Sequence, residues 1–286
     1  MKIRITSDST CDLNELSKTH DVGILPLQVN LDSKAYHDGV DITPQDIFAF
    51  VAETKILPKT SAPSIGEYEE FFARELEGYD ELIHFNISSK ASGSHNFAKE
   101  ASKSFGGKVR VIDSKALSSG QGLLVLKATD MRDAGATGEE IEKAVLEIRE
   151  RINTSFVPDT LDYLHKGGRC SSMKMLAANI LKIHPKIVMV DGQLQQGGTC
   201  KGSMERCITK YVEELAVAYP SYDKSRCFVT HSSADKALVD VAKAKVKELF
   251  DFDEVYETVA GSIVTSHCGK GTLGVLFVYK IGRAHV

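Results

Sequence analysis

Short apolar runs of strand length alternate with helical segments along this chain, and this alternation limits its fold more than any other feature. The apolar run 82–87 is followed at once by small hydroxyl residues at 88–94, and the run 108–112 ends in the same way at Asp113 and Ser114. N-cap residues with an acidic third position begin helices after Thr43, Ser64 and Thr137. Strands that alternate with helices are typical of parallel sheets, so we expect an α/β fold whose first half contains a mostly parallel sheet flanked by helices.

The second half of the chain has a different pattern. Helical periodicity at about 203–218 and 234–250 is interleaved with apolar runs, among them 273–279, and the segment 188–194 reads as a hairpin on an Asp-Gly turn. This pattern predicts a second α/β domain with a mixed sheet. We place the boundary near 154–158 and expect domains at 1–155 and 156–280.

The last six residues, 281–286, match the translation of a common sequencing adapter. We expect them to be a non-native tail, and His285 is therefore left out of every site considered below.

Composition and charge exclude several classes of protein. The chain has 286 residues, 42% hydrophobic and 26% charged, which is typical of a folded globular protein, and its net charge of −4 argues against nucleic-acid binding. The longest apolar stretches are strand length, so we expect no transmembrane segment. The amino terminus lacks an apolar signal-peptide core, which favours a cytoplasmic location. Six widely spaced cysteines without a C-x-x-C pair predict reduced thiols.

A glycine-rich segment near the carboxyl terminus has two interpretations. Residues 269–274 match the G-x-G-x-x-G dinucleotide fingerprint, but an apolar strand follows them where that motif requires a helix, so a glycine-rich turn is the better interpretation. The preceding His267 and Cys268 lack a second ligand pair with zinc-like spacing, and we expect no metal. From residue types alone, His267 is equally consistent with a functional site and with a histidine that satisfies a buried polar group.

Hydroxyl residues are abundant at two predicted helix starts, 60–64 and 88–93. Capping needs one hydroxyl per helix, so the surplus suits a carboxylate or phosphate held by neutral donors. The turn 166–169 adds a cation at Arg169, although solvated Arg-Gly turns are common. The residues alone therefore predict a two-domain α/β protein with an anion site.

The chain contains five ordered motifs: Ser7-Asp8-Ser9-Thr10-Cys11-Asp12-Leu13, Thr60-Ser61-Ala62-Pro63-Ser64, Ile87-Ser88-Ser89-Lys90-Ala91-Ser92-Gly93, Leu161-Asp162-Tyr163-Leu164-His165-Lys166-Gly167-Gly168-Arg169 and Ser266-His267-Cys268-Gly269. Together they closely resemble the DegV family. The resemblance covers nearly the whole chain and implies a bacterial fatty-acid-binding protein of lipid transport and fatty-acid metabolism, in which two α/β domains enclose one long acyl chain such as palmitate or oleate. Some members present that acid to a separate fatty acid kinase, so the family implies a carrier with no cofactor.

The resemblance also implies roles for individual residues. Thr60 and Ser92 would hydrogen-bond the carboxylate, His267 would lie close to it, and Arg169 would lie at the domain junction near the pocket or the partner surface. The chain departs from many relatives at Lys270 and Cys170. Secondary candidates for the site are Ser61, Ser89, Gly93 and Ser266.

Two other functions are compatible with the same residues. The chain could be a hydrolase or phosphotransferase that uses His267 and the Ser/Thr clusters, or a scaffold whose bound lipid is only structural. The expected partners of the preferred function are a fatty acid and a kinase, with no nucleic acid and at most transient membrane contact.

Overall fold

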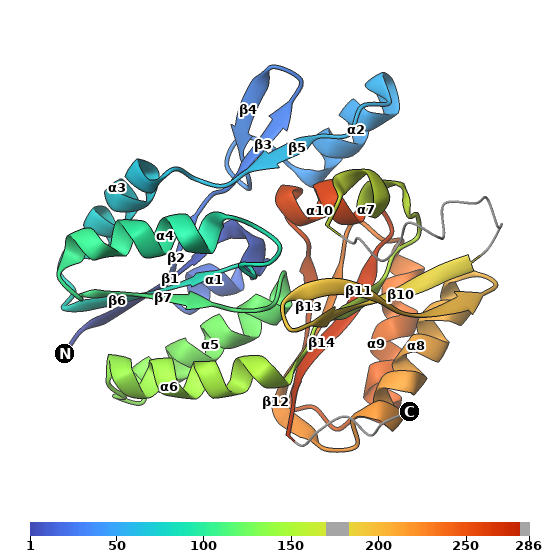
Figure 1. Ribbon diagram of the computed structural model, residues 1–286. Coiled ribbons are helices and arrows are strands. Elements are labelled where there is room, and N and C mark those ends of the chain that lie inside the picture. Colours follow the sequence, from blue (N-terminus) through green and yellow to red (C-terminus); the bar gives the residue numbers. More distant parts are fainter. Residues whose placement is uncertain (170–182, 281–286) are drawn as a thin grey trace.

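The computed structural model describes residues 1–169 and 183–280. Within these residues the chain forms a two-domain α/β fold with a parallel sheet in its first half and a mixed sheet in its second half, as predicted (Figure 1). The departure at Cys170, the tail at 281–286 and His285 lie outside the described residues.

The first-half sheet has four strands in the order β2-β1-β6-β7, and every neighbouring pair is parallel. Helices cover both faces, with α3 and α4 on one side and α5 and α6 on the other (Figure 1). Coverage on both sides explains why the strands read as nearly continuous apolar runs. The elements are β1 (Ile3–Asp8), β2 (Val22–Leu25), β6 (Glu81–Asn86), β7 (Val109–Asp113), α3 (Ile65–Glu75), α4 (Ser94–Ser102), α5 (Ser119–Asp133) and α6 (Gly138–Ile148).

The second-half sheet has seven strands in the order β11-β10-β9-β14-β12-β13, with β8 also paired to β14. Only the β12–β13 pair is parallel, which makes the sheet mixed. Helices α8 and α9 pack on its outer side (Figure 1). The elements are β8 (Ile152–Asn153), β9 (Ser155–Val157), β10 (Ile183–Val190), β11 (Gln193–Lys201), β12 (Tyr222–His231), β13 (Glu254–Val259), β14 (Leu273–Tyr279), α8 (Met204–Ala218) and α9 (Lys236–Leu249).

A small antiparallel sheet, which the sequence did not reveal, projects from the first half. The apolar run 23–29 suggests one strand, but the chain forms two, β2 and β3 (Gln28–Leu31), on either side of Pro26. Proline has no N–H for a strand ladder, so the run divides there. Strand β3 pairs with β4 (Lys34–His37) and β5 (Lys59–Ser61), and all three lie above the short helix α10 (Ser262–Cys268) in Figure 1.

Local sequence signals correctly predict where several helices begin. Capping boxes start α2 (Pro44–Thr54), α3 and α6, in each case through the Thr or Ser and the acidic residue that the sequence suggests. The hairpin β10–β11 turns at Asp191 and Gly192, whose φ values of 45° and 79° match an Asp-Gly turn. The remaining helical elements are η1 (Ser9–Cys11), α1 (Leu16–Thr19), η2 (Lys103–Phe105), η3 (Arg149–Arg151) and α7 (Asp162–Gly167).

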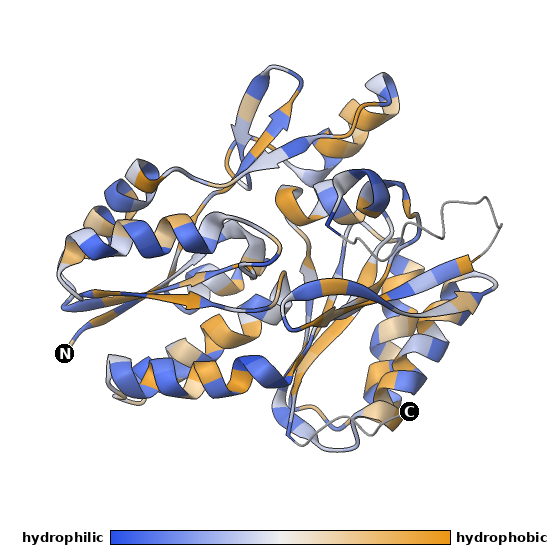
Figure 2. Cartoon of the chain, in the orientation of Figure 1, coloured by the Kyte–Doolittle hydropathy of each residue, from blue (hydrophilic) through white to orange (hydrophobic). Residues whose placement is uncertain are grey.

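Apolar residues concentrate on the central strands and on the inner faces of the helices, while the outer helix faces are mostly hydrophilic (Figure 2). None of the helices in the described part of the chain is long and apolar enough to span a bilayer.

The cysteines differ from the prediction. Cys200, at the end of β11, and Cys207, in α8, form a disulfide, so the expectation of six reduced thiols is wrong for this pair. Their spacing of seven residues is no recognised motif, and only the turn between strand and helix brings them together. Cys11, Cys227 and Cys268 are free and buried.

Candidate functional site

A cavity of about 180 Å³ lies where the two halves of the chain meet. Its residues come from β5 and the loops after β6 and β7 in the first half, and from α10, β11 and the segment after α7 in the second. Most of its wall is apolar, and its polar lining residues are Thr60, Ser61, Ser92, Arg169 and His267. The apolar wall includes Leu27, Ile87, Leu117, Leu194, Ile263 and Val264.

Thr60 and His267 are two of these polar residues. A hydrogen bond of 2.8 Å joins Thr60 Oγ1 to His267 Nε2, although the two residues are 207 positions apart. Thr60 lies on β5, where it pairs with Val29 of β3, and His267 lies near the end of α10. The structure therefore brings together two residues that the sequence implicates separately.

The surroundings of His267 keep its imidazole neutral. Burial and, to a smaller extent, the nearby charge of Arg169 lower the pKa of His267 to about 4. Nδ1 is shielded from solvent and has no hydrogen-bond partner within residues 1–169 and 183–280. It faces α7 so closely that a Cβ on Gly167 would lie 2.9 Å from it. When Nε2 carries the proton and donates to Thr60 Oγ1, the Thr60 hydroxyl can donate its own proton to a ligand.

Ser92 and Ser61 also line the cavity, but their hydroxyl groups are used differently. Ser92 Oγ accepts a hydrogen bond from the backbone N–H of Ser94 and lies 2.8 Å from Ser94 Oγ. Ser61 Oγ donates to Gln28 Oε1 and accepts from Asn30 Nδ2. A hydroxyl has one proton, so the Ser61 proton is already used, whereas the Ser92 proton can be donated to a ligand.

Of the other candidate residues, two line the cavity and two do not. Gly93 and Arg169 line the cavity, and the exposed Arg169 donates to the Gly167 carbonyl. Ser89 and Ser266 do not line it: Ser89 Oγ donates to Asp113, and Ser266 Oγ donates to the Ser262 carbonyl.

A smaller cavity of about 30 Å³ adjoins the first. The two share Leu117, Val264 and Cys268 as wall residues. Burial raises the pKa of the Cys268 thiol to about 12, so this side chain is a neutral, weakly polar group in the wall. The surface of the smaller cavity, like that of the first, is mostly apolar.

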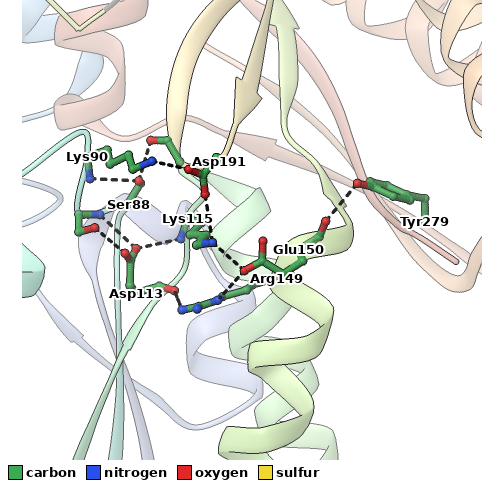
Figure 3. A network of polar contacts seen from close by, with 10 residues as sticks. Ser88, Lys90, Asp113, Lys115, Arg149, Glu150, Asp191 and Tyr279 are labelled. Atoms are coloured by element: carbon green, nitrogen blue, oxygen red, sulfur yellow. Dashed lines mark hydrogen bonds and ion pairs between the residues drawn. The ribbon is translucent and has the colours of Figure 1, made fainter. Parts of the chain in front are cut away.

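The β10–β11 hairpin closes one side of the cavity, and a polar network holds its tip (Figure 3). Lys90 and Lys115 both pair with Asp191, at 2.5 and 3.1 Å, and Ser88 Oγ donates to the Gly192 carbonyl at 2.7 Å. A Cβ at Gly192 would lie 2.6 Å from Ser88 Oγ, so the turn fits against this loop only as glycine. Leu194, two residues beyond Gly192, is thereby held in the cavity wall.

The glycine-rich segment 269–274 is a turn, as the sequence favours. Gly269 and Gly271 have φ values of 79° and 81°, and β14 follows from Leu273, so the helix that a dinucleotide site requires is missing at this position. In residues 1–169 and 183–280, no group of three or more His, Cys, Asp or Glu side chains could hold a metal ion.

Sequence reasoning missed the apolar wall. Leu117, Leu194 and Val264 have the same pattern as ordinary core residues, and each is 7–8% exposed. Leu194 lies on the second strand of the predicted hairpin, and that prediction does not place it at a site. No local signal distinguishes a side chain that lines a cavity from one that fills a core.

Comparison with known protein families gives a match over nearly the whole chain. The matching family model is described as "Uncharacterised protein, DegV family", and it covers residues 2–280. A DegV domain-containing protein of Caldanaerobacter subterraneus is 32% identical over 283 residues, which cover 98% of this chain and 99% of that protein.

Solved structures share the architecture. A DegV family protein from Thermus thermophilus, whose structure is described as fatty acid binding, is similar with a TM-score of 0.88 and 28% identity, over 98% of this chain and 100% of that one. A Thermotoga maritima protein, described as revealing a fatty acid binding function, has a TM-score of 0.82 and 28% identity, over 97% and 99% of the two chains.

Proposed function

The chain belongs to the DegV family, and from this membership we propose that it binds one long-chain fatty acid, such as palmitate or oleate, between its two domains. We assign the domains to 1–155 and 156–280. In this proposal Thr60, Ser92 and His267 hold the carboxylate, and the acyl chain follows the apolar wall toward Cys268.

The single observation that carries the proposal is a mostly apolar cavity whose lining also contains the hydrogen-bonded pair Thr60 and His267. A carboxylate loses its hydration when it enters such a site, so hydroxyl and N–H donors must replace the water. The Thr60 hydroxyl can supply one donor when it accepts from His267 Nε2, and the Ser92 hydroxyl can supply another when Ser94 Oγ donates to it. Arg169 adds a cation to the cavity lining. Each buried methylene contributes about 0.8 kcal/mol, so a sixteen-carbon chain gains on the order of 10 kcal/mol before the costs of association.

The geometry around His267 favours a carrier over a hydrolase or phosphotransferase. A catalytic histidine usually has its second ring nitrogen oriented by a carboxylate, but Nδ1 of His267 faces Gly167 and has no hydrogen-bond partner among the residues that the structure describes. A pKa of about 4 also makes His267 a weak base at neutral pH. We therefore propose that the protein presents the carboxylate to a separate kinase and does not itself turn the fatty acid over.

Two lining residues of the cavity are compatible with such a partner. Arg169 is exposed, and Phe97 is 42% exposed although it also lines the cavity. Arginine and aromatic residues are enriched at protein interfaces.

The proposal is tested by denaturing mass spectrometry of an organic extract from protein purified without detergent. We expect fatty acid near one molecule per chain, and we expect no acyl phosphate when the protein is incubated with palmitate and ATP alone. An empty extract, together with no thermal stabilisation by added palmitate or oleate, would refute fatty-acid binding. Formation of acyl phosphate by the protein alone would favour the phosphotransferase.

A further inference from the structure

The first of the five motifs, 7–13, does not line the cavity, yet it contains two buried carboxyl groups. Asp8 is bound inside the first-half core, by Thr10, Gln121 and the backbone N–H of Ile87. Asp12 faces the other way, toward the segment that leads into α10. The two aspartates of one motif therefore have different environments.

Asp12 and a third buried carboxyl group, Asp38, bind the start of α10. Asp12 Oδ1 accepts the backbone N–H of Gly261 at 2.8 Å, and Asp38 Oδ1 accepts that of Ser262 at 2.6 Å. The first backbone N–H groups of a helix have no partner within the helix, so the carboxylates satisfy them.

Hydroxyl groups orient both carboxylates. Ser118 Oγ donates to Asp12 at 2.5 Å, and Ser9 Oγ donates to Asp38 at 2.8 Å. Both carboxylates are thus held by first-half residues while they bind a helix of the second half.

The carboxylates of Asp38 and Asp12 lie close to the backbone at Gly261. A Cβ on Gly261 would lie 3.0 Å from each carboxylate oxygen of Asp38 and 3.2 Å from Asp12 Oδ1. Asn14, another first-half residue, binds the same segment at Val259. Its side chain donates to the Val259 carbonyl and accepts a hydrogen bond from the Val259 N–H. First-half side chains therefore bind this segment at Val259, Gly261 and Ser262.

The small sheet holds α10 at both of its ends. Asp38 follows β4 and binds the start of the helix, while Thr60 on β5 binds His267 near its end. Strands β4 and β5 both pair with β3 (Figure 1). Because α10 has only seven residues, a shift at its start is transmitted to its end with little loss.

We propose that Asp38 and Asp12 are positioning residues for the fatty-acid headgroup, and that they act by fixing α10 so that His267 stays against Thr60. Neither carboxylate touches the ligand in this arrangement. The inference rests on the fatty-acid-binding function proposed above and assigns to it two residues outside the cavity.

The test compares two ligands of equal chain length, palmitate and hexadecan-1-ol, whose dissociation constants are measured by competition against a fluorescent fatty acid. The alcohol shares the acyl path but lacks the carboxylate. A residue that only stabilises the fold should affect both ligands alike, whereas a headgroup-positioning residue should reduce the preference for the acid. We expect Asp38→Ala to reduce that preference at least fivefold and Asp38→Asn, which retains an acceptor oxygen for Ser262, to restore most of it.

Matched variants keep the proposal falsifiable. Asp41→Ala removes an exposed carboxylate that binds the His37 backbone in the same loop, and it should leave the preference unchanged. If Asp38→Ala does not fold, Gly261→Ala should reduce the preference instead, because the added Cβ forces the carboxylates away from α10. In a His267→Ala background, Asp38→Ala should cause no further reduction.

An unchanged preference in Asp38→Ala, or in Gly261→Ala where the former does not fold, would overturn the inference while leaving fatty-acid binding intact. A wild-type protein that binds neither ligand would instead refute the proposed function itself.

Discussion

Replacing Thr60 by valine tests the headgroup site most directly, because valine keeps the shape of threonine and removes only the hydroxyl. In the structure that hydroxyl bonds to His267 Nε2, and its proton can point to the ligand. The variant therefore leaves a bound carboxylate short of one donor and leaves the imidazole without its partner, while the apolar packing around position 60 stays the same.

The expected loss follows from the cost of leaving one buried polar group unsatisfied, which is about 1–3 kcal/mol. A factor of ten in affinity corresponds to about 1.4 kcal/mol, so the dissociation constant for palmitate should rise by about 5- to 150-fold. The fold should be nearly unaffected, because Thr60 is only half-buried and its backbone pairing with Val29 is retained.

The assay is titration of delipidated protein with palmitate, followed by displacement of a fluorescent fatty acid, together with thermal unfolding of the free protein. Thr209→Val is the matched control, because the Thr209 hydroxyl bonds only to the Glu205 carbonyl within α8. A Thr60→Val protein that binds palmitate as tightly as the wild type would refute the assignment of Thr60 to the carboxylate. Equal losses in both variants would show that the effect is not specific to the site.

Three further predictions address the rest of the cavity. Ser92→Ala should weaken palmitate binding by about 1–3 kcal/mol in the same titration, whereas Ser61→Ala should not, because the Ser61 proton is already donated to Gln28; equal effects would contradict this reading of the two hydroxyls. Cys268→Leu should shift the preference in a series of C12 to C18 acids toward shorter chains and Cys268→Ala toward longer ones, since this residue lies between the two cavities; shifts in the same direction would refute the proposed path. The folded-state pKa of His267, about 4, lies below the ordinary 6.5, so the unfolded chain binds the proton more readily and His267 lowers stability as pH falls from about 6.5 to about 4. Relative to His267→Gln, the free energy of unfolding of the wild type, measured in urea, should fall by up to about 3 kcal/mol over that interval. Parallel pH profiles of the two proteins would contradict the lowered pKa of His267.

The features that the sequence predicts well are those that depend on neighbouring residues. The capping boxes at Thr43, Ser64 and Thr137 and the Asp-Gly turn at 191–192 each act within about four residues, and each was predicted correctly. The small sheet and the disulfide depend instead on how distant segments meet. Pro26 divides an apparently continuous strand, and the Cys200–Cys207 pair forms only because β11 turns back into α8.

In the candidate site, the sequence likewise does not predict which single hydroxyl groups face the cavity. Ser89 and Ser92 belong to one cluster and look equivalent in the sequence, but only Ser92 lines the cavity, while Ser89 binds Asp113. The backbone between them turns into α4, so two residues three positions apart face different surroundings. A cluster of hydroxyls can therefore indicate an anion site without indicating which hydroxyl donates to the ligand.

The two aspartates of the motif 7–13 also look equivalent in the sequence but have different roles in the fold. Asp8 and Asp12 are separated by the single turn η1, which directs one carboxyl group into the first-half core and the other toward α10. Both are buried, and both would be equally unfavourable without their donors. Their burial has different consequences, since the donors of Asp8 all belong to the first half of the chain, whereas Asp12 takes the Gly261 N–H from the second. Loss of Asp8 should therefore weaken one domain, while loss of Asp12 should loosen the joint that brings His267 to Thr60.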